Sequence, residues 1–227
     1  MKKEKKAINL KDVVSDGLSG LSEIVANDVP DDVIKSRTEF YKERFMHHGY
    51  DDREPYNLRV ISEYCAELYS GTSRSQKGLC LMGLTGRGKT LAFSIMKKLF
   101  RLRVYQAADL VELWQVHGVK NRYEIYELLK GNYSDRGQPA IDVLWRDRCI
   151  DDIGTEPILN EFGTKQEVID TIIQKCCNEF RDCGARTHMA VNLTPKMFIE
   201  RYGVRAESRL HQMCHVVTLR GNDRRRD

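Results

Sequence analysis

Short apolar runs and helically spaced apolar residues alternate along most of this 227-residue chain. A run of about four to eight apolar residues indicates a buried strand, whereas apolar residues three and four positions apart indicate one face of a helix. We therefore expect strands at 78–82, 102–107, 143–152, 187–191 and 215–219, and helices at 30–49, 57–70, 91–100, 109–114, 164–180 and 194–203. Strands that alternate with helices predict an α/β fold with a parallel sheet flanked by helices on both faces.

Polar residues at the expected helix starts sharpen three of these boundaries. Asp109 and Thr164 each stand three residues before a glutamate, the spacing of a capping box in which two side chains bond each other's backbone N–H groups. Thr194 followed by Pro195 predicts an N-cap with a first-turn proline. Gly203 is expected to end that helix.

The N-terminal part of the chain has the weakest sequence pattern. Residues 1–28 mix charge with scattered apolar side chains and show no period, so we expect a flexible or partner-dependent arm. A helix from Pro30 follows, and the helix at 57–70 is expected to pack on the main domain. We divide the chain into an N-terminal arm and helix, 1–54, which would bind a partner, and a main domain, 55–227.

The stretch GLTGRGKT at residues 83–90 fits the phosphate-binding pattern G-x-x-x-x-G-K-[ST] at every fixed position. It lies between an expected strand and an expected helix, which places a bound anion at a helix N-terminus. Lys89 would reach the β- and γ-phosphates, and the Thr90 hydroxyl would hold Mg²⁺. The predicted nucleotide-binding residues are Gly83, Leu84, Thr85, Gly86, Arg87, Gly88, Lys89, Thr90 and Leu91.

Two acidic residues end the expected strand at 143–152. A strand of this kind, downstream of a P-loop, is the usual second half of a nucleoside triphosphate site. Asp151 would orient Mg²⁺, and Asp152 would polarise the attacking water as a general base. Asp147 and Arg148 make this strand more polar than a buried parallel strand usually is.

Composition narrows the class of protein. With 41% hydrophobic and 31% charged residues, the chain resembles a soluble globular protein. No apolar run approaches the ~20 residues that a membrane span needs, and no apolar segment of a secretory signal follows the charged N-terminus. The seven cysteines contain no C-x-x-C pair, which suits reduced, buried thiols in a cytoplasmic protein without membrane attachment.

Two other features each leave alternatives open. The net charge is +4 and the basic surplus lies in residues 76–227, so nucleic acid is a reasonable partner, although such a surplus is also common on surfaces that bind nothing. Basic and aromatic residues interleave within 118–140, where they would either contact nucleic acid or form the outer and inner faces of an amphipathic helix; we favour the helix. His211 and His215 beside Cys214 are interpreted as structural residues rather than metal ligands.

The order of motifs resembles a known family. The stretches 83–90, 150–156, 191–193 and 202–210, taken together, are similar to the AAA+ ATPases of the DnaC/DnaI helicase-loader and IstB transposition-helper group, over roughly residues 55–221. The resemblance implies a P-loop NTPase fold of the AAA+ type with a small helical N-terminal segment. It differs from the group in the polar strand before Asp151, and its N-terminal part lacks a Cys/His cluster.

The resemblance also implies roles for three further residues. Asn192 matches the sensor-1 residue that helps to place the attacking water. Arg209 matches an arginine finger that reaches the γ-phosphate of a neighbouring subunit, with Arg205 as an accessory. An arginine supplied in trans can neutralise charge in the transition state, and it makes hydrolysis depend on homo-oligomer assembly.

Three functions follow as hypotheses. The first is an ATP- and Mg²⁺-dependent ATPase of DNA replication that binds single-stranded DNA and a replicative helicase. The second is an IstB-like ATPase that binds duplex DNA and recruits a transposase. The third is a nucleotide-switched assembly module with weak hydrolysis, which Asp152 in place of the commoner glutamate keeps open. A small-molecule kinase would leave Asn192 and the two arginines without a role.

Overall fold

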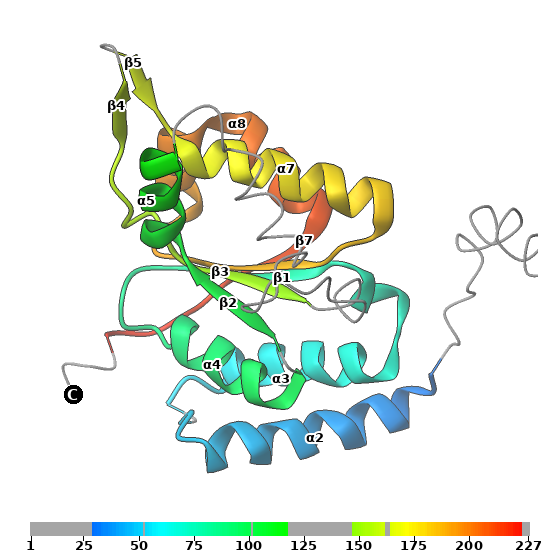
Figure 1. The fold of residues 1–227 in the computed structure, drawn as a ribbon. Helices are drawn as coiled ribbons and strands as arrows, with labels where there is room; N and C mark the ends of the chain where they lie inside the picture. The colour runs from blue at the N-terminus through cyan, green and yellow to red at the C-terminus, as the bar shows by residue number, and fades with distance from the viewer. Residues whose placement is uncertain (1–28, 52, 101, 118–146, 162–163, 224–227) are drawn as a thin grey trace, which may run out of the picture.

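A five-stranded parallel sheet forms the centre of the computed structural model, which describes residues 29–51, 53–100, 102–117, 147–161 and 164–223 (Figure 1). The order of its strands is β2-β3-β6-β1-β7. Their bounds are β1 Gly78–Met82, β2 Arg103–Gln106, β3 Arg148–Ile153, β6 Thr187–Val191 and β7 Cys214–Thr218. The predicted α/β fold with a parallel sheet is therefore confirmed. Residues 1–28 and 118–146, including the expected arm and the basic and aromatic segment, lie outside the described residues.

Helices cover both faces of this sheet (Figure 1). One layer contains α2 Asp31–His47, α3 Pro55–Ser70 and α4 Lys89–Phe100; the other contains α5 Ala107–His117, α7 Val168–Cys183 and α8 Pro195–Met213. The remaining elements are the short 3-10 helix η2, Ser73–Gln76, and an antiparallel hairpin of β4, Leu159–Glu161, and β5, Thr164–Gln166. None of the described helices is long and apolar enough to cross a membrane.

Alternation along β1 separates two hydrophobic cores. Leu79 and Leu81 face the core under α2, α3 and α4, whereas Cys80 and Met82 face the core under α5, α7 and α8. Successive side chains of a strand point to opposite faces of the sheet, so a strand covered on both faces is apolar throughout. The α3 helix packs on the main core, as expected from sequence. The side chains of α2 join the same core, which includes Tyr41.

Helix α8 begins as predicted but extends further than predicted. The Thr194 hydroxyl accepts a hydrogen bond from the backbone N–H of Met197, which is the expected N-cap. The backbone leaves helical geometry at Gly203, with φ of 85° and ψ of 166°. A residue with a side chain is strained at this positive φ, so glycine permits the break. The helix resumes beyond it and continues to Met213, which the sequence pattern did not predict.

Both predicted capping boxes are wrong. Helix α5 begins at Ala107, directly after β2, so Asp109 lies inside its first turn instead of before it. Thr164 lies in β5 and pairs with Glu161 across the hairpin, and α7 begins only at Val168. Backbone pairing in the hairpin replaces the local side-chain cap. The direct junction of β2 with α5 and the pairing of β4 with β5 therefore replace the predicted caps.

The cysteines have the environment that their spacing predicted. All seven are free thiols, and all but Cys183 are buried. Burial raises the pKa of Cys65 and of Cys80, which keeps these thiols protonated and unreactive.

Candidate nucleotide-binding site

The P-loop connects the carboxyl end of β1 to the first turn of α4. Gly83, Gly86 and Gly88 have φ angles of 139°, 84° and 87°, which residues with side chains rarely adopt. A Cβ at Gly88 would also lie 3.2 Å from the ring of the buried Tyr50. The glycines of the motif are thus required by the backbone path. This arrangement aims the N–H groups of the first turn of α4 at the loop, where an anion is favoured.

Lys89 folds back into this loop. Its side chain is buried, and its Nζ donates hydrogen bonds to the carbonyl oxygens of Gly83, at 2.7 Å, and Leu84, at 2.9 Å. The ammonium charge is therefore held at the mouth of the loop by main-chain oxygens, close to where phosphate oxygens would approach the glycines.

The structure brings Thr90 and Asp151 together across 61 positions of sequence. The Thr90 hydroxyl donates to Asp151 Oδ1 at 3.2 Å, and the Asp152 N–H donates to the same oxygen at 2.9 Å. Burial raises the pKa of the Asp151 carboxyl, and the charge of Asp152 raises it further; bonds from Asp152, Thr90 and Gln106 offset these effects only in part. A hydroxyl and a carboxylate oxygen are ligands of the kind that Mg²⁺ prefers.

Asp152 and Asn192 form a second pair beside the first. Asn192 Nδ2 donates to Asp152 Oδ1 at 2.7 Å, and the Asn192 backbone N–H donates to the Ile153 carbonyl at 2.7 Å. Asp152 has a φ of 60°, the one positive φ among the described non-glycine residues. The β3–β6 pairing shifts register between Ile150 and Ile153, the stretch that contains Asp152. Strained backbone of this kind is frequent at functional sites.

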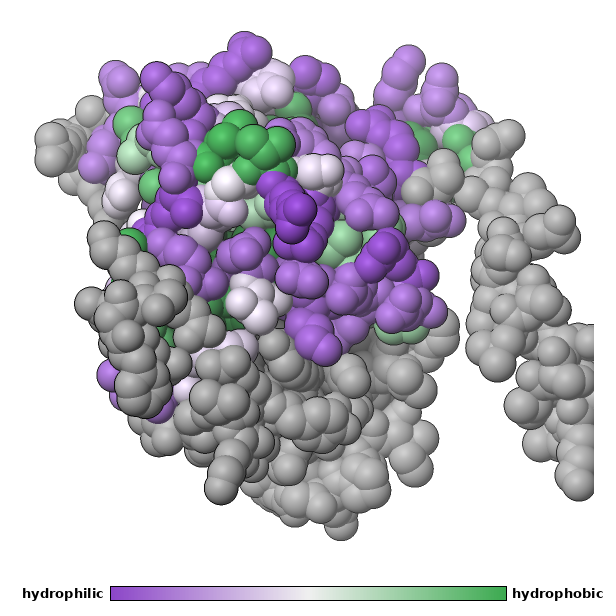
Figure 2. Space-filling model, turned by 90° about the horizontal axis from the view of Figure 1, so that it is seen from above, coloured by the Kyte–Doolittle hydropathy of each residue, from purple (hydrophilic) through white to green (hydrophobic). Residues whose placement is uncertain are grey.

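The two predicted finger arginines belong to a different part of the structure. Both lie on α8 beyond Gly203, where the Arg205 side chain is exposed. Arg209 is a quarter exposed, and its guanidinium lies 3.7 Å from Asp170 Oδ1 on α7. Seen from above, the described part of the surface is largely hydrophilic, with one compact hydrophobic group (Figure 2).

The start of α3 and the chain after β7 border the P-loop. Arg87 donates to the Leu219 carbonyl at 2.8 Å. Asn57 exchanges two hydrogen bonds of 2.9 Å with the backbone of Arg220, whose guanidinium lies 3.9 Å from the centre of the Tyr56 ring. These contacts form one side of the loop from segments that are far apart in sequence.

Three polar residues around this site had no role assigned from the sequence. Gln106 is paired with Asp151 across β2 and β3 and bonds to its carboxyl. Beyond the end of β3, the buried Glu156 forms an ion pair of 2.9 Å with the partly exposed Arg201. Glu156 stands only four residues after Asp152, and this closeness in sequence is the feature that could have identified it. No sequence feature could have identified Arg201, because nothing in its local sequence distinguishes it from the other basic residues.

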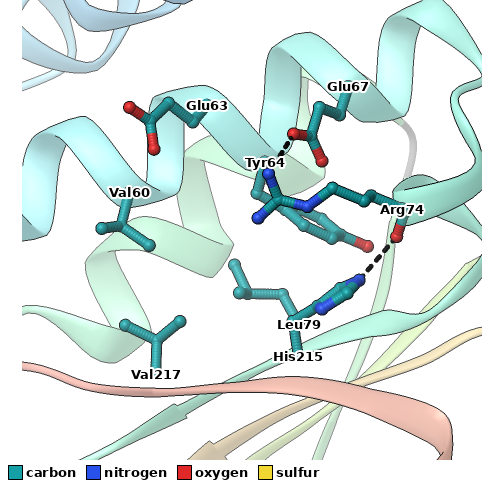
Figure 3. Close-up of a pocket in the computed structure, with 8 residues that line it drawn as sticks. All are labelled: Val60, Glu63, Tyr64, Glu67, Arg74, Leu79, His215 and Val217. Carbon is teal, nitrogen blue, oxygen red and sulfur yellow. Dashed lines mark hydrogen bonds and ion pairs between the residues drawn. The ribbon is translucent and has the colours of Figure 1, made fainter. Parts of the chain in front are cut away.

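A separate small pocket lies between α3 and β7 (Figure 3). Arg74 lies across it, paired with Glu67 at 2.8 Å, and the Arg74 carbonyl accepts a hydrogen bond of 2.7 Å from His215 Nε2. Burial raises the pKa of Glu67, against the lowering effect of Arg74 and His215. His215 thus has a structural contact here, and the pocket's lining residues differ from the predicted phosphate-site residues.

This chain is similar in fold to solved structures but matches no sequence family. No family model matches it, and no curated protein matches it significantly. A candidate primosome component from Streptococcus pyogenes serotype M3 is similar over 77% of this chain and 85% of its own, with 18% identity and a TM-score of 0.52.

Two further solved structures are similar more distantly. The DnaC helicase loader is 15% identical over 84% of this chain and 100% of its own, with a TM-score of 0.47. DnaI is 17% identical over 85% of this chain and 95% of its own, with a TM-score of 0.48. At these identities the comparison concerns the fold. The structure from Streptococcus pyogenes shows that this chain shares its overall α/β fold with that protein, in agreement with the fold class predicted from the sequence.

Proposed function

We propose that this protein is an AAA+ ATPase that assists DNA replication in the manner of a helicase loader. One observation carries the catalytic part of the proposal. The P-loop threonine and Asp151 are in hydrogen-bond contact, and the Asp152–Asn192 pair lies beside them at the carboxyl ends of parallel strands. Ligands of open parallel sheets bind at this edge.

Each residue of the cluster has a specific task in this proposal. Lys89 binds the β- and γ-phosphates, and Thr90 with Asp151 holds Mg²⁺. The bound ion would neutralise charge on the phosphate oxygens. Asp152 accepts a hydrogen bond from the attacking water and polarises it, while Asn192 keeps the Asp152 carboxylate in place through the 2.7 Å bond.

The proposal includes assembly, because the ion pair of Arg209 is with Asp170 on α7 and not with a residue of the P-loop. Arg209 would leave Asp170 and reach the γ-phosphate of a neighbouring copy, and Arg205 would assist from its exposed position. An arginine finger is worth about 10³ to 10⁵ in turnover. Hydrolysis would then report that subunits have assembled.

The replication role rests on the order of the motifs and on the kind of protein with a similar fold. The neighbour from Streptococcus pyogenes is described as a primosome component. Single-stranded DNA is the preferred nucleic-acid partner and a replicative helicase the protein partner. The N-terminal segment, 1–54, would choose that partner.

The catalytic proposal is tested with purified wild-type protein, three site variants and one control variant. Lys89→Ala should lose nucleotide binding, whereas Asp152→Asn and Arg209→Ala should bind ATP normally. Arg209→Ala should lower kcat about 10³-fold or more. Arg59→Ala, on the exposed surface of α3, serves as the control and should leave kcat unchanged. Normal turnover by Arg209→Ala would contradict an arginine supplied in trans.

The nucleic-acid partner is tested by fluorescence anisotropy of labelled single-stranded and duplex DNA, with and without ATP and Mg²⁺. ATP-dependent preference for single strands supports the helicase-loader function. Preference for duplex would instead favour a transposition helper. Nucleotide binding without binding to either DNA would leave a nucleotide-switched assembly module.

A further inference from the structure

The loop after β3 is held by two neighbouring residues of α8. The Glu156 side chain is 1% exposed; one of its oxygens accepts the Gly154 N–H at 2.6 Å, and the other accepts the Tyr202 hydroxyl and lies 2.9 Å from Arg201. A buried carboxylate is costly unless it is paired and hydrogen-bonded, and both of its oxygens are engaged here.

Arg201 contacts more of the loop than this carboxylate. Its guanidinium donates to the carbonyl oxygens of Gly154 and Glu156, each at 2.8 Å, and to Glu167 Oε1 at 3.3 Å. The planar fork of an arginine can serve several acceptors at fixed angles, which a lysine ammonium cannot do. The contacts therefore define the position of the loop relative to α8, in addition to balancing charge.

This loop is continuous with the Asp152–Asn192 pair. Gly154 stands two residues after Asp152, and a Cβ at Gly154 would lie 2.6 Å from the Leu193 side chain, next to Asn192. The Ile153 carbonyl accepts the Asn192 N–H. A shift of the loop would therefore move the groups that orient Asp152.

The same two α8 residues stand directly before the break at Gly203. The helix beyond that break carries Arg205 and Arg209, so its direction depends on how Arg201 and Tyr202 are anchored. The cluster of Glu156, Arg201 and Tyr202 thus connects the end of β3 with the arginine-bearing part of α8.

We propose that Arg201 is a positioning residue that couples the predicted arginine finger to the Asp152–Asn192 pair through Glu156. In this proposal Arg201 acts on the loop and on α8 and needs no contact with the nucleotide. This inference rests on the proposed ATPase function. If Arg201 had only a structural role, its substitution would affect folding without changing the turnover of the folded protein.

Arg201→Lys tests the coupling because it keeps the charge opposite Glu156 and removes the fork. We expect the ATP dissociation constant to stay within about twofold, while kcat falls about tenfold to hundredfold, the effect of a small misplacement of reacting groups. Lys196→Met, at an exposed position of the same helix, is the matched control and should leave kcat unchanged. Glu156→Gln, which keeps the side-chain shape, should lower kcat in the same way.

Mixed assemblies separate coupling from a one-sided effect. Equal mixtures of Asp152→Asn and Arg209→Ala should regain activity, because each supplies what the other lacks. Arg201→Lys should be restored by neither of these two variants, since both its own site and its finger are displaced. Restoration by one of them, or a folded Arg201→Lys with unchanged kcat, would overturn the coupling. An inactive wild-type protein would instead remove the proposed function, and this inference with it.

Discussion

Charged residues lie at both ends of strand β3. At its beginning they are paired with groups of opposite charge, whereas at its far end two residues of like charge are adjacent. At the beginning, Asp147 Oδ1 accepts from Arg186 Nε at 2.9 Å, and Asp147 Oδ2 lies 3.6 Å from His188 Nε2. Arg148 is buried, pairs with Glu179 and donates to the Thr187 hydroxyl at 2.8 Å. Opposite charges meet there.

At the far end, two acidic residues are adjacent. Asp151 is 1% exposed, and burial and the charge of Asp152 both raise its pKa. Its bonds come from the Thr90 hydroxyl, the Asp152 N–H and the Gln106 side chain, none of which carries a full charge. Like charges kept together in a buried position cost stability, and a bound cation would relieve that cost. The comparison separates charges that are paired within the fold from an acidic pair that we propose binds a cation.

Breaking the pairing at the beginning of β3 should have the largest effect on stability. Arg148→Met leaves Glu179 without its cation in a mostly buried position, so we expect a loss of about 3 to 5 kcal/mol in the free energy of unfolding. Urea unfolding measures it. The control is Arg59→Met, which breaks the exposed Arg59–Glu63 pair of 2.8 Å and should cost about 0.5 kcal/mol or less. Equal losses in the two variants would contradict the assignment.

Asp147 should make the free energy of unfolding depend on pH in the acid range. Burial alone would raise the pKa of Asp147, but its interactions with His188 and Arg186 outweigh burial and lower it. A lowered native pKa gives stability that is present above the unfolded pKa of about 3.9 and is lost as pH falls through the native value.

Asp147→Asn tests this dependence. At neutral pH it should lose about 2 kcal/mol, the contribution of a hydrogen bond to a charged group. Its urea midpoint, followed below pH 5, should change less with pH than that of the wild type. Parallel acid profiles for the two proteins would argue against the Asp147 pairing.

Asp151→Asn should have the smallest effect on stability and the opposite sign. A raised native pKa means that the charged form lowers stability as pH rises through that value. Asparagine retains an oxygen for the Thr90 and Asp152 bonds, so we expect a gain of about 1 kcal/mol at neutral pH without Mg²⁺, together with loss of Mg²⁺-dependent hydrolysis. Thermal unfolding at pH 6 and 8 measures it. A variant less stable than wild type at pH 8 would mean that the acidic pair carries no such cost.

Local sequence determined the P-loop and most of the helices and strands. The loop comes from consecutive residues whose glycines must adopt positive φ, and the cores come from apolar spacing that each segment carries by itself. Arg148 shows the limit of such patterns. Its charge made β3 look unsuited to burial, and its partner Glu179 lies on a helix 31 positions away.

Tertiary structure decided how the separate motifs meet. Thr90 contacts Asp151, and Arg201 reaches Glu156, only because the strand order brings the ends of β1, β3 and β6 to one edge and packs α8 beside them. Backbone conformation depends mainly on neighbours in sequence, whereas a buried charge depends on neighbours in space.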